Sequence, residues 1–359
     1  MTLPLVSVVI PCRNAGRMLR PALESVLGQT WPRLEIIFVD NNSTDGSAAV
    51  AQQVLGADAR PFVVTECAAQ GVNHTRNFGY GLAHGDYIQW LDADDCLDPD
   101  KIALQVAALD ASPADDIAYG DWSVHWLWAG RPDRTRRHTP TQTNDQVLRT
   151  LTGIWYPPHS YLLRRSAAEL LQRVQAWWPA RGVATDVEYS ALAALLGLRF
   201  RYVPGAHVHY HVWSDQQLTS AIRQDERIAS LRAIFQRLRR FADDSRARVT
   251  LTDAHRLLLQ QDWTPAALRR DLVTFVRLAQ GRFILRRRRD GHRIELDRHE
   301  AMIARWLTFT GYAAVPMHQA LAIAADVPEL SDDTIGIFRA IDRLRREGFL
   351  PPIDAADKG

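Results

Sequence analysis

Four short apolar runs, separated by segments with helical spacing, occupy the first quarter of the chain and constrain its fold more than any other feature. The runs are LVSVVI (5–10), LEIIFVD (34–40), RPFVVTE (60–66) and DYIQWLD (86–92), and the segments between them are RMLRPALESVLGQT, AAVAQQVLG and VNHTRNFGYGLAHG. Continuous β-branched runs are typical of strands that are covered on both faces. Alternation of strand and helix at this pace predicts βαβ units, and hence an α/β fold with a mostly parallel sheet and helices on both faces.

An acidic cluster follows the fourth run directly, because Asp92, Asp94 and Asp95 lie in the sequence LDADDCLD. Two carboxylates about 4 Å apart repel by roughly 4 kcal/mol at an effective dielectric of about 20, so water or a cation must compensate. Ligands of open α/β sheets bind at the carboxyl ends of the strands, and Mg²⁺ and Mn²⁺ prefer oxygen ligands. From these residues alone, a metal site and a solvated acidic turn that caps the next helix both remain open.

The pattern of predicted secondary structure changes near residue 216. Before it, we expect a helix over 99–110, then an aromatic, irregular stretch (YGDWSVHWLWAG), a basic loop over 131–144, a helix in TDVEYSALAALLG, and short strands in RFRYVP and AHVHYHVW. After it, helical spacing dominates in QDERIASLRAIFQRLRRF, TPAALRRDLVTFVRLAQG, HEAMIARWLTFTG and SDDTIGIFRAIDRLRREG. A length of 359 residues favours about two domains. The sequence therefore predicts an α/β domain over 1–218 and an all-helical C-terminal domain over 219–359.

Composition and charge exclude several classes of protein. Hydrophobic residues make up 47% and charged residues 23% of the chain, which is typical of a globular protein, and a net charge of +2 argues against a protein that coats nucleic acid. Cys12, Cys67 and Cys96 show no CxxC spacing, so we expect neither a disulfide framework nor a zinc site, and a cytoplasmic location fits best. The N-terminus lacks the basic region of a signal peptide, and no run of about 18 apolar residues predicts a membrane-spanning helix.

Five pieces of the sequence occur in the order and at roughly the spacing seen in family 2 glycosyltransferases. They are VSVVIPCRN, LEIIFVDNNSTDGS, GVNHTRNFG, YIQWLDADD and TDVEY, and the resemblance covers residues 4 to about 215. It implies a GT-A (Rossmann-like) fold for a catalytic domain over 1–218. It also implies a nucleotide-sugar donor, most often a UDP-sugar, and a Mn²⁺ or Mg²⁺ ion. The sugar would pass to an acceptor hydroxyl with inversion at the anomeric carbon.

The acidic cluster and the end of the second strand receive donor-binding roles from this resemblance. Asp94 is expected to contact the metal ion, which would neutralise the departing diphosphate, while Asp92 contacts the ribose or the water shell of the metal. Asp40 resembles the carboxylate that recognises the nucleobase, since a carboxylate can accept the imide N–H of uracil. The family more often has Asp-Asp-Gly-Ser where this chain has DNNS (40–43), and a turn cap is the alternative role for Asp40.

Three further residues match donor contacts of the family. Pro11 and Asn14, in IPCRN, resemble the first loop, which lies against the nucleoside; an ordinary turn after the strand is the alternative. Arg76, in HTRNFG, resembles the arginine that helps to hold the nucleotide, because a guanidinium suits phosphate oxygens or can lie flat along a base. An exposed charge on a helix is the alternative for Arg76.

Asp186, in ATDVEYSALAALL, is the candidate catalytic base that the resemblance implies. An inverting transfer needs one carboxylate to take the proton from the acceptor hydroxyl, which is worth about 10²–10⁴ in rate. The family has an acidic pair here, whereas this chain has Thr185 before Asp186. Glu188 is the competing base, and a helix cap is the structural alternative. A helix N-terminus would lower the pKa of Asp186, whereas burial by a bound acceptor would raise it again.

Two basic clusters have less specific interpretations. His207, His209 and His211 alternate on an expected strand, so they share one face, either near the diphosphate or metal or exposed to solvent. The arginine-rich RFILRRRRDGHR (282–293) could lie on an anionic leaflet, at about 1 kcal/mol per charge. That would give a peripheral contact at the inner face of the cell membrane, and a solvated basic turn between helices is the alternative.

The leading hypothesis is a metal-dependent, hexosyltransferase-type inverting glycosyltransferase in bacterial surface polysaccharide or glycoconjugate synthesis, with a glycan or lipid-linked acceptor. A dinucleotide-dependent oxidoreductase would need a GxGxxG turn after the first strand, which IPCRNAG does not supply. A non-catalytic scaffold that binds nucleotide or glycan is the alternative, because Asn41, Asn42 and Thr185 replace family residues.

Overall fold

The structure is a computed structural model of the chain. It describes residues 2–127, 132–140, 145–151, 156–179, 184–213, 224–244 and 246–252, with short segments between 255 and 347. The chain forms two compact units. The first comprises Met1–Gln146, Trp155–Ser230 and Ala242–Val249, and the second comprises Val147–Ile154, Leu231–Phe241 and Thr250–Gly359. The predicted domain boundary at residue 218 stays a prediction.

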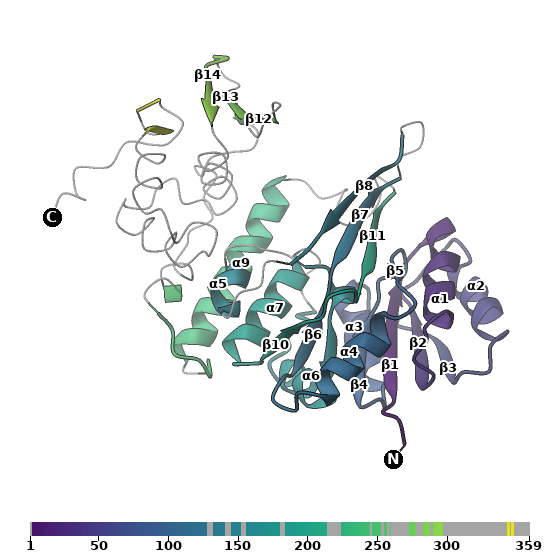
Figure 1. The fold of residues 1–359 in the computed structure, drawn as a ribbon. Helices are drawn as coiled ribbons and strands as arrows, with labels where there is room; N and C mark the ends of the chain where they lie inside the picture. The colour runs from purple at the N-terminus through teal and green to yellow at the C-terminus, as the bar shows by residue number, and fades with distance from the viewer. Residues whose placement is uncertain are drawn as a thin grey trace. The chain divides into compact units, whose positions relative to one another are not determined.

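A seven-stranded sheet forms the centre of the first unit, with strand order β10-β6-β9-β4-β1-β2-β3 (Figure 1). Its strands are β1 (Val6–Cys12), β2 (Leu34–Asp40), β3 (Phe62–Glu66), β4 (Tyr87–Trp90), β6 (Ile117–Tyr119), β9 (Leu162–Arg164) and β10 (Phe200–Tyr202). Neighbouring strands are parallel except at β9, which runs antiparallel to β4 and β6. The four apolar runs of the sequence are β1 to β4, and the predicted α/β fold with a mostly parallel sheet is confirmed.

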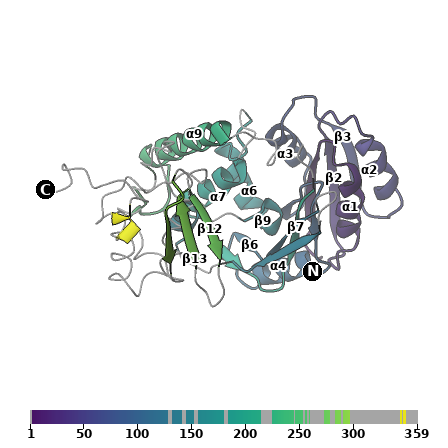
Figure 2. The same cartoon turned by 90° about the horizontal axis from the view of Figure 1, so that it is seen from above.

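Helices follow the strands. Those that the spacing predicts are α1 (Leu19–Leu27), α2 (Ser47–Leu55), α3 (Val72–Gly81), α4 (Lys101–Asp110), α7 (Thr185–Leu195) and α9 (Gln224–Asp243). The helices α5 (Gln146–Leu151) and α6 (Arg165–Arg173) and the 3₁₀ turns η1 (Gly16–Met18) and η2 (Pro158–Ser160) are not among the predicted elements. The chain moves outward from β1 to β3 and then returns to β4. Right-handed crossovers therefore place α1 and α2 on one face of the sheet and α3 on the other (Figure 2).

Close approach of α3 to the sheet depends on a glycine. A Cβ at Gly79 would lie 2.6 Å from Cγ1 of Val9 and 3.1 Å from Cγ2 of Val39. The missing side chain lets the helix that carries Arg76 lie directly on β1 and β2. That helix therefore holds Arg76 at the carboxyl ends of these strands.

A second, four-stranded sheet continues from the acidic cluster, in the order β5-β11-β7-β8. Its strands are β5 (Cys96–Leu97), β11 (Val208–Val212), β7 (Trp122–Trp126) and β8 (Arg134–His138). The expectation of irregular structure in YGDWSVHWLWAG and of a loop over 131–144 is wrong for β7 and β8. Both strands are short, and their Trp, Val and Thr residues favour a pleated sheet that the neighbouring arginines and histidines obscure in the sequence.

The all-helical prediction for the C-terminal region is wrong for its described residues in 273–296. They form an antiparallel sheet of β12 (Val273–Arg277), β13 (Phe283–Arg287) and β14 (Arg293–Leu296). VTFVR and FILRR combine β-branched and aromatic residues, and Leu285 is buried while Arg286 is exposed, which is the period of a strand. The RFILRRRRDGHR segment is therefore not a turn between helices. The helices predicted in HEAMIARWLTFTG and in most of SDDTIGIFRAIDRLRREG lie outside the described residues.

Among the helices of the described ranges, none is long and apolar enough to cross a membrane.

Candidate active site

The carboxyl ends of β2 and β4 carry the carboxylates that the sequence singled out. Asp40 ends β2, opposite Cys12 of β1, and Asp92 follows β4 on the other side of β1. Since neighbouring strands lie about 4.8 Å apart, the two carboxylates are separated by roughly 10 Å along this edge. A nucleoside diphosphate is of that length. The edge can therefore take a base at Asp40 and a diphosphate near Asp92.

Asp40 is buried, with 4% of its surface exposed. Its Oδ2 accepts a hydrogen bond from the Ser43 N–H at 2.9 Å. Its Oδ1 is also buried and accepts no hydrogen bond from any residue in the described ranges. A buried acceptor without a donor is unfavourable by about 1–3 kcal/mol. A ligand N–H would satisfy it.

The loops beside Asp40 are held by asparagines. The Asn14 N–H donates to Ser43 Oγ at 3.0 Å, and Asn14 Oδ1 accepts from the Thr44 N–H at 2.8 Å. Asn14 has a φ of 52°, a left-handed conformation that asparagine tolerates. Asn41 donates to the carbonyls of Cys67 and Ala69 at 2.8 and 2.9 Å. Asn41, which differs from the more common family residue, thus links β2 to the segment after β3. Pro11 lies one residue before the end of β1.

Arg76 is buried, at 4% exposure, between an acid and a ring. One guanidinium nitrogen lies 2.6 Å from Asp92 Oδ1, and the guanidinium carbon lies 4.2 Å from the centre of the Trp177 ring. The Trp177 backbone is held by Asn77, which donates to its carbonyl at 2.8 Å. Arg76 is therefore paired with Asp92 through one nitrogen, while its buried Nε has no hydrogen-bond partner among the described residues. Its alternative as an exposed charge is excluded.

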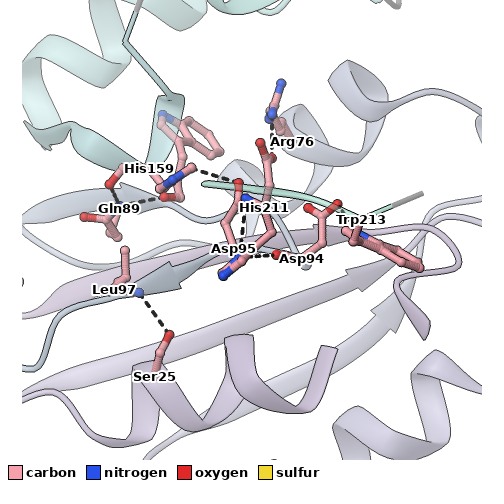
Figure 3. Close-up of polar contacts among 11 residues, drawn as sticks. Ser25, Arg76, Gln89, Asp94, Asp95, Leu97, His159, His211 and Trp213 are labelled. Atoms are coloured by element: carbon pink, nitrogen blue, oxygen red, sulfur yellow. Dashed lines mark hydrogen bonds and ion pairs between the residues drawn. The ribbon is translucent and has the colours of Figure 1, made fainter. Parts of the chain in front are cut away.

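The three carboxylates of the acidic turn have different partners, and Figure 3 shows those of Asp94 and Asp95. Asp92 faces Arg76, and Asp94 Oδ2 accepts from Trp213 Nε1 at 3.1 Å. Asp95 is fully buried, and its Oδ1 accepts from the His211 N–H at 2.7 Å. Asp92 and Asp94 keep part of their surface exposed. These two carboxylates are thus accessible to a bound ligand.

A fully buried histidine completes the turn. His159, in η2, places Nδ1 at 3.2 Å from Asp95 Oδ2. Burial lowers the pKa of His159 to about 3. Burial, reinforced by the charges of Asp94 and Asp92, raises the pKa of Asp95 well above its ordinary 3.8. Burial therefore favours the uncharged form of both groups. Nothing in WYPPHSY distinguishes His159 in the sequence, since the stretch has no periodicity and no ligand spacing.

Two ligand sets for a divalent cation surround this turn. Asp92, Asp95 and His159 each offer a ligand atom within 4.8 Å of the others. Asp92 and Asp94 offer the partly exposed set that the sequence favours. Carboxylate oxygens suit Mg²⁺ and Mn²⁺, and an added imidazole favours a transition metal. The residues present therefore fit a divalent cation at the turn, and Asp92 belongs to both sets.

Asp186 lies in the first turn of α7 with a partly exposed side chain. Burial raises its pKa to about 6. The nearby charge of Arg76 opposes this rise and that of Asp92 adds to it, so these three groups share one electrostatic neighbourhood. The effect of burial outweighs that of the helix N-terminus. The competing Glu188 has no exposed surface, so it cannot meet an acceptor hydroxyl in this conformation.

The three alternating histidines share one face of β11, as predicted. His207 Nε2 lies 2.9 Å from Ser123 Oγ, and His209 lies between Asp98, at 2.8 Å, and His125, at 2.9 Å. His211 Nδ1 lies 2.9 Å from the Asp94 carbonyl oxygen. Only His211 therefore contacts the acidic turn directly, and the face is partly buried rather than a solvent-exposed surface.

Residues 7–171 match the family model described as "Glycosyl transferase family 2". The chain carries a family 2 glycosyltransferase domain. An uncharacterized glycosyltransferase of Haemophilus influenzae is 35% identical over 30% of this chain and 42% of its own length. YibD of Escherichia coli, another uncharacterized glycosyltransferase, is 33% identical over 40% of this chain and 43% of its own length. A PGL/p-HBAD biosynthesis glycosyltransferase of Mycobacterium tuberculosis is 31% identical over 38% of this chain and 55% of its own length. The matches thus span about half of each relative.

The glycosyltransferase domain also has solved structural neighbours. S. aureus TarS (1–349) has a TM-score of 0.53 at 14% identity, covering 95% of this chain and 91% of that one. The same protein in complex with UDP-GlcNAc has a TM-score of 0.54 at 15% identity, covering 95% and 92%. At this identity the likeness shows the fold, which is the GT-A type.

Proposed function

We propose that the protein transfers a sugar from a nucleotide-diphosphate sugar, a UDP-sugar in the first instance, to an acceptor hydroxyl with inversion of the anomeric carbon. The observation that carries the proposal is the common neighbourhood of Asp92, Arg76 and Asp186 at the carboxyl edge of the sheet. Asp92 lies in the acidic turn, where a cation would bind, and Asp186 is a carboxylate with a raised pKa. A transferase needs both, whereas a nucleotide-binding scaffold needs only the first.

The donor would lie along the edge from Asp40 to the acidic turn. Asp40 Oδ1 would accept the imide N–H of the base, and Pro11 and Asn14 would line the nucleoside. A Mn²⁺ or Mg²⁺ ion held by Asp94 and Asp92 would neutralise the diphosphate. Arg76 would hold Asp92 in place with the guanidinium nitrogen that lies 2.6 Å from this carboxylate. Its buried Nε has no hydrogen-bond partner among the described residues and would donate to a phosphate oxygen of the nucleotide. The UDP-GlcNAc complex of TarS, a neighbour of the same fold, supports a uridine donor.

Asp186 would act as the general base. Its carboxylate takes the proton from the acceptor hydroxyl while that oxygen attacks the anomeric carbon and the bond to the diphosphate oxygen breaks. A pKa of about 6 keeps the group ionised near neutral pH while leaving it a stronger base than an exposed aspartate. A partly exposed position in α7 allows contact with an acceptor.

Other observations support the proposed acceptor and cellular setting. The mycobacterial relative, whose name refers to PGL/p-HBAD biosynthesis, supports a surface glycan or lipid-linked acceptor. The three cysteines are free, which supports a cytoplasmic setting. A peripheral contact with an anionic membrane through 282–293 is also proposed. Arg286 is exposed there, Arg287 is paired with Asp290 at 2.9 Å, and Arg288 and Arg289 lie outside the described residues.

Incubation of the purified protein with Mn²⁺ and a panel of nucleotide sugars tests the proposal. We expect release of the nucleoside diphosphate from one donor, faster in the presence of a suitable acceptor. An Asp186→Asn variant should bind that donor without releasing its nucleoside diphosphate. Binding without release from any donor, with every acceptor class tried, would favour the non-catalytic scaffold instead.

A further inference from the structure

An exposed, strongly basic strand forms one edge of the four-stranded sheet (Figure 1). β8 reads RTRRH, and its first four residues are exposed. In the described part of the chain β8 pairs only with β7, antiparallel, so its outer edge is open. Three arginines in five residues on one open edge need an explanation that the donor site does not supply.

The register separates these arginines onto two faces. Arg137 lies opposite Ser123, on the histidine face, and its guanidinium is 3.3 Å from the Asp121 carboxylate. Arg134 and Arg136 lie opposite Trp126 and Val124, on the other face. Arg137 is thus neutralised within the sheet, and the second face carries the excess charge.

That second face is aromatic as well as basic. The Arg134 guanidinium lies 5.7 Å from the centre of the partly exposed Trp126 ring. Arg136 is exposed as well. Two exposed guanidinium groups beside an aromatic ring can bind an anion in a bidentate manner and also pack against its organic part.

One residue of this face, Tyr210, contacts the buried histidine beside the acidic turn. Tyr210 of β11 lies in the same register row as Val124 and Arg136, and its ring stacks on His159 with the centres 6.3 Å apart. Two strand spacings place Arg136 roughly 10 Å from Tyr210. An acceptor whose hydroxyl reaches the transfer site would therefore extend across these strands to the two arginines.

We propose that this face of β8, β7 and β11 binds a phosphate-bearing, anionic segment of the acceptor through Arg134 and Arg136, with Trp126 as an apolar platform. The inference rests on the proposed function and narrows its acceptor class. Membrane-binding basic clusters typically contain four to eight cations, and proteins that bind duplex DNA contact about 6–10 phosphates. Two cations and one ring match a short anionic segment better than either.

A synthetic hexamer of propane-1,3-diol phosphodiester, labelled with fluorescein, is the probe, because it has phosphates but no base, sugar or lipid. Anisotropy gives its affinity for the full chain and for the Arg134→Gln, Arg136→Gln double variant. The control is the Arg20→Gln, Arg173→Gln double variant, which removes the same charge from exposed residues of α1 and α6. An Arg134→Lys, Arg136→Lys variant tests whether charge suffices. Calorimetric binding of UDP with Mn²⁺ is measured on every variant.

We expect the glutamine variant to bind the hexamer at least tenfold more weakly than the control. Its slope of log affinity against log salt should be shallower by about 1.4, since each phosphate contact contributes roughly 0.7. The lysine variant should bind with intermediate affinity, and UDP binding should not change. Equal affinities of the glutamine and control variants for the hexamer, or no hexamer binding by the wild type, would overturn this inference alone. Absence of UDP binding by the wild type would overturn the proposed function. Tighter binding to hexathymidylate or to phosphatidylglycerol vesicles, lost in the glutamine variant, would assign the face to nucleic acid or membrane and refute the proposal.

Discussion

Replacing Asp186 with asparagine is expected to abolish sugar transfer and, in the metal-free protein at neutral pH, to raise the free energy of unfolding. Burial raises the pKa of Asp186 from an ordinary 3.8 to about 6, so the folded state holds its proton more tightly than the unfolded state does. Each pH unit between these values corresponds to 1.36 kcal/mol. Ionised Asp186 therefore destabilises the fold by at most about 3 kcal/mol, and an uncharged amide of the same shape avoids this effect.

The sign of the pH dependence follows by linkage. Since the folded pKa is above the unfolded pKa, the wild type and the variant have equal free energies of unfolding below about pH 4. The free energy of unfolding of the wild type then falls below that of the variant as the pH rises from 4 to 6. Urea denaturation with EDTA should show the variant more stable by up to roughly 3 kcal/mol at pH 7.5 and equal to the wild type near pH 4. A domain of this size gains about 2–4 °C in Tm per kcal/mol.

Asp45→Asn is the control of opposite sign. Burial pushes the pKa of Asp45 upward, but hydrogen bonds from Ser47 and Gly16 prevail and lower it. That variant should be less stable than the wild type at neutral pH, and the difference should vanish in acid. If Asp186→Asn is no more stable than the wild type at pH 7.5 while Asp45→Asn behaves as expected, the reasoning about Asp186 is refuted.

Three further outcomes are expected. The kcat/KM for transfer should fall about tenfold per pH unit below pH 6, because protonated Asp186 cannot accept the hydroxyl proton; a profile that is flat from pH 7 to pH 5 would exclude it as the base. Arg76→Ala should lower the free energy of unfolding by about 3 kcal/mol, since it leaves Asp92 without its partner and removes the contact with Trp177; a loss below 1 kcal/mol in urea denaturation would contradict the burial argument. Asp40→Asn should weaken UDP binding at least tenfold and leave pyrophosphate binding unchanged, because an amide N–H₂ would face the imide N–H; equal losses for both ligands in calorimetry would remove Asp40 from base recognition.

The sequence predicted which residues gather at the carboxyl edge of the sheet, because they lie at the ends of regular elements. Apolar β-branched runs locate β1, β2 and β4, and a parallel sheet brings their carboxyl ends to one edge. Asp40 and Asp92 follow those runs, and Arg76 lies on the helix between them. The resemblance to family 2 glycosyltransferases assigned these three residues to one site, and the parallel sheet explains why they lie at the same edge.

The interior of the site was not predictable in this way. His159 and Trp177 come from stretches without periodicity, and only tertiary packing brings them to Asp95 and Arg76. The raised pKa of Asp186 likewise depends on burial that no local pattern encodes. Short strands were missed for a related reason, since β8 and β13 carry arginines that mask the two-residue period.

Calorimetric titration of UDP with and without Mn²⁺, on the wild type and on Asp94→Ala, tests the cation at the acidic turn most directly. We expect Mn²⁺ to strengthen UDP binding by the wild type and to have no effect on Asp94→Ala, whose circular dichroism should be unchanged. His159→Gln, measured alongside, should keep most of the Mn²⁺ effect. Binding of UDP that is indifferent to Mn²⁺ in the wild type would contradict the cation site, and loss of the effect in His159→Gln alone would move the ion to the buried set of Asp92, Asp95 and His159.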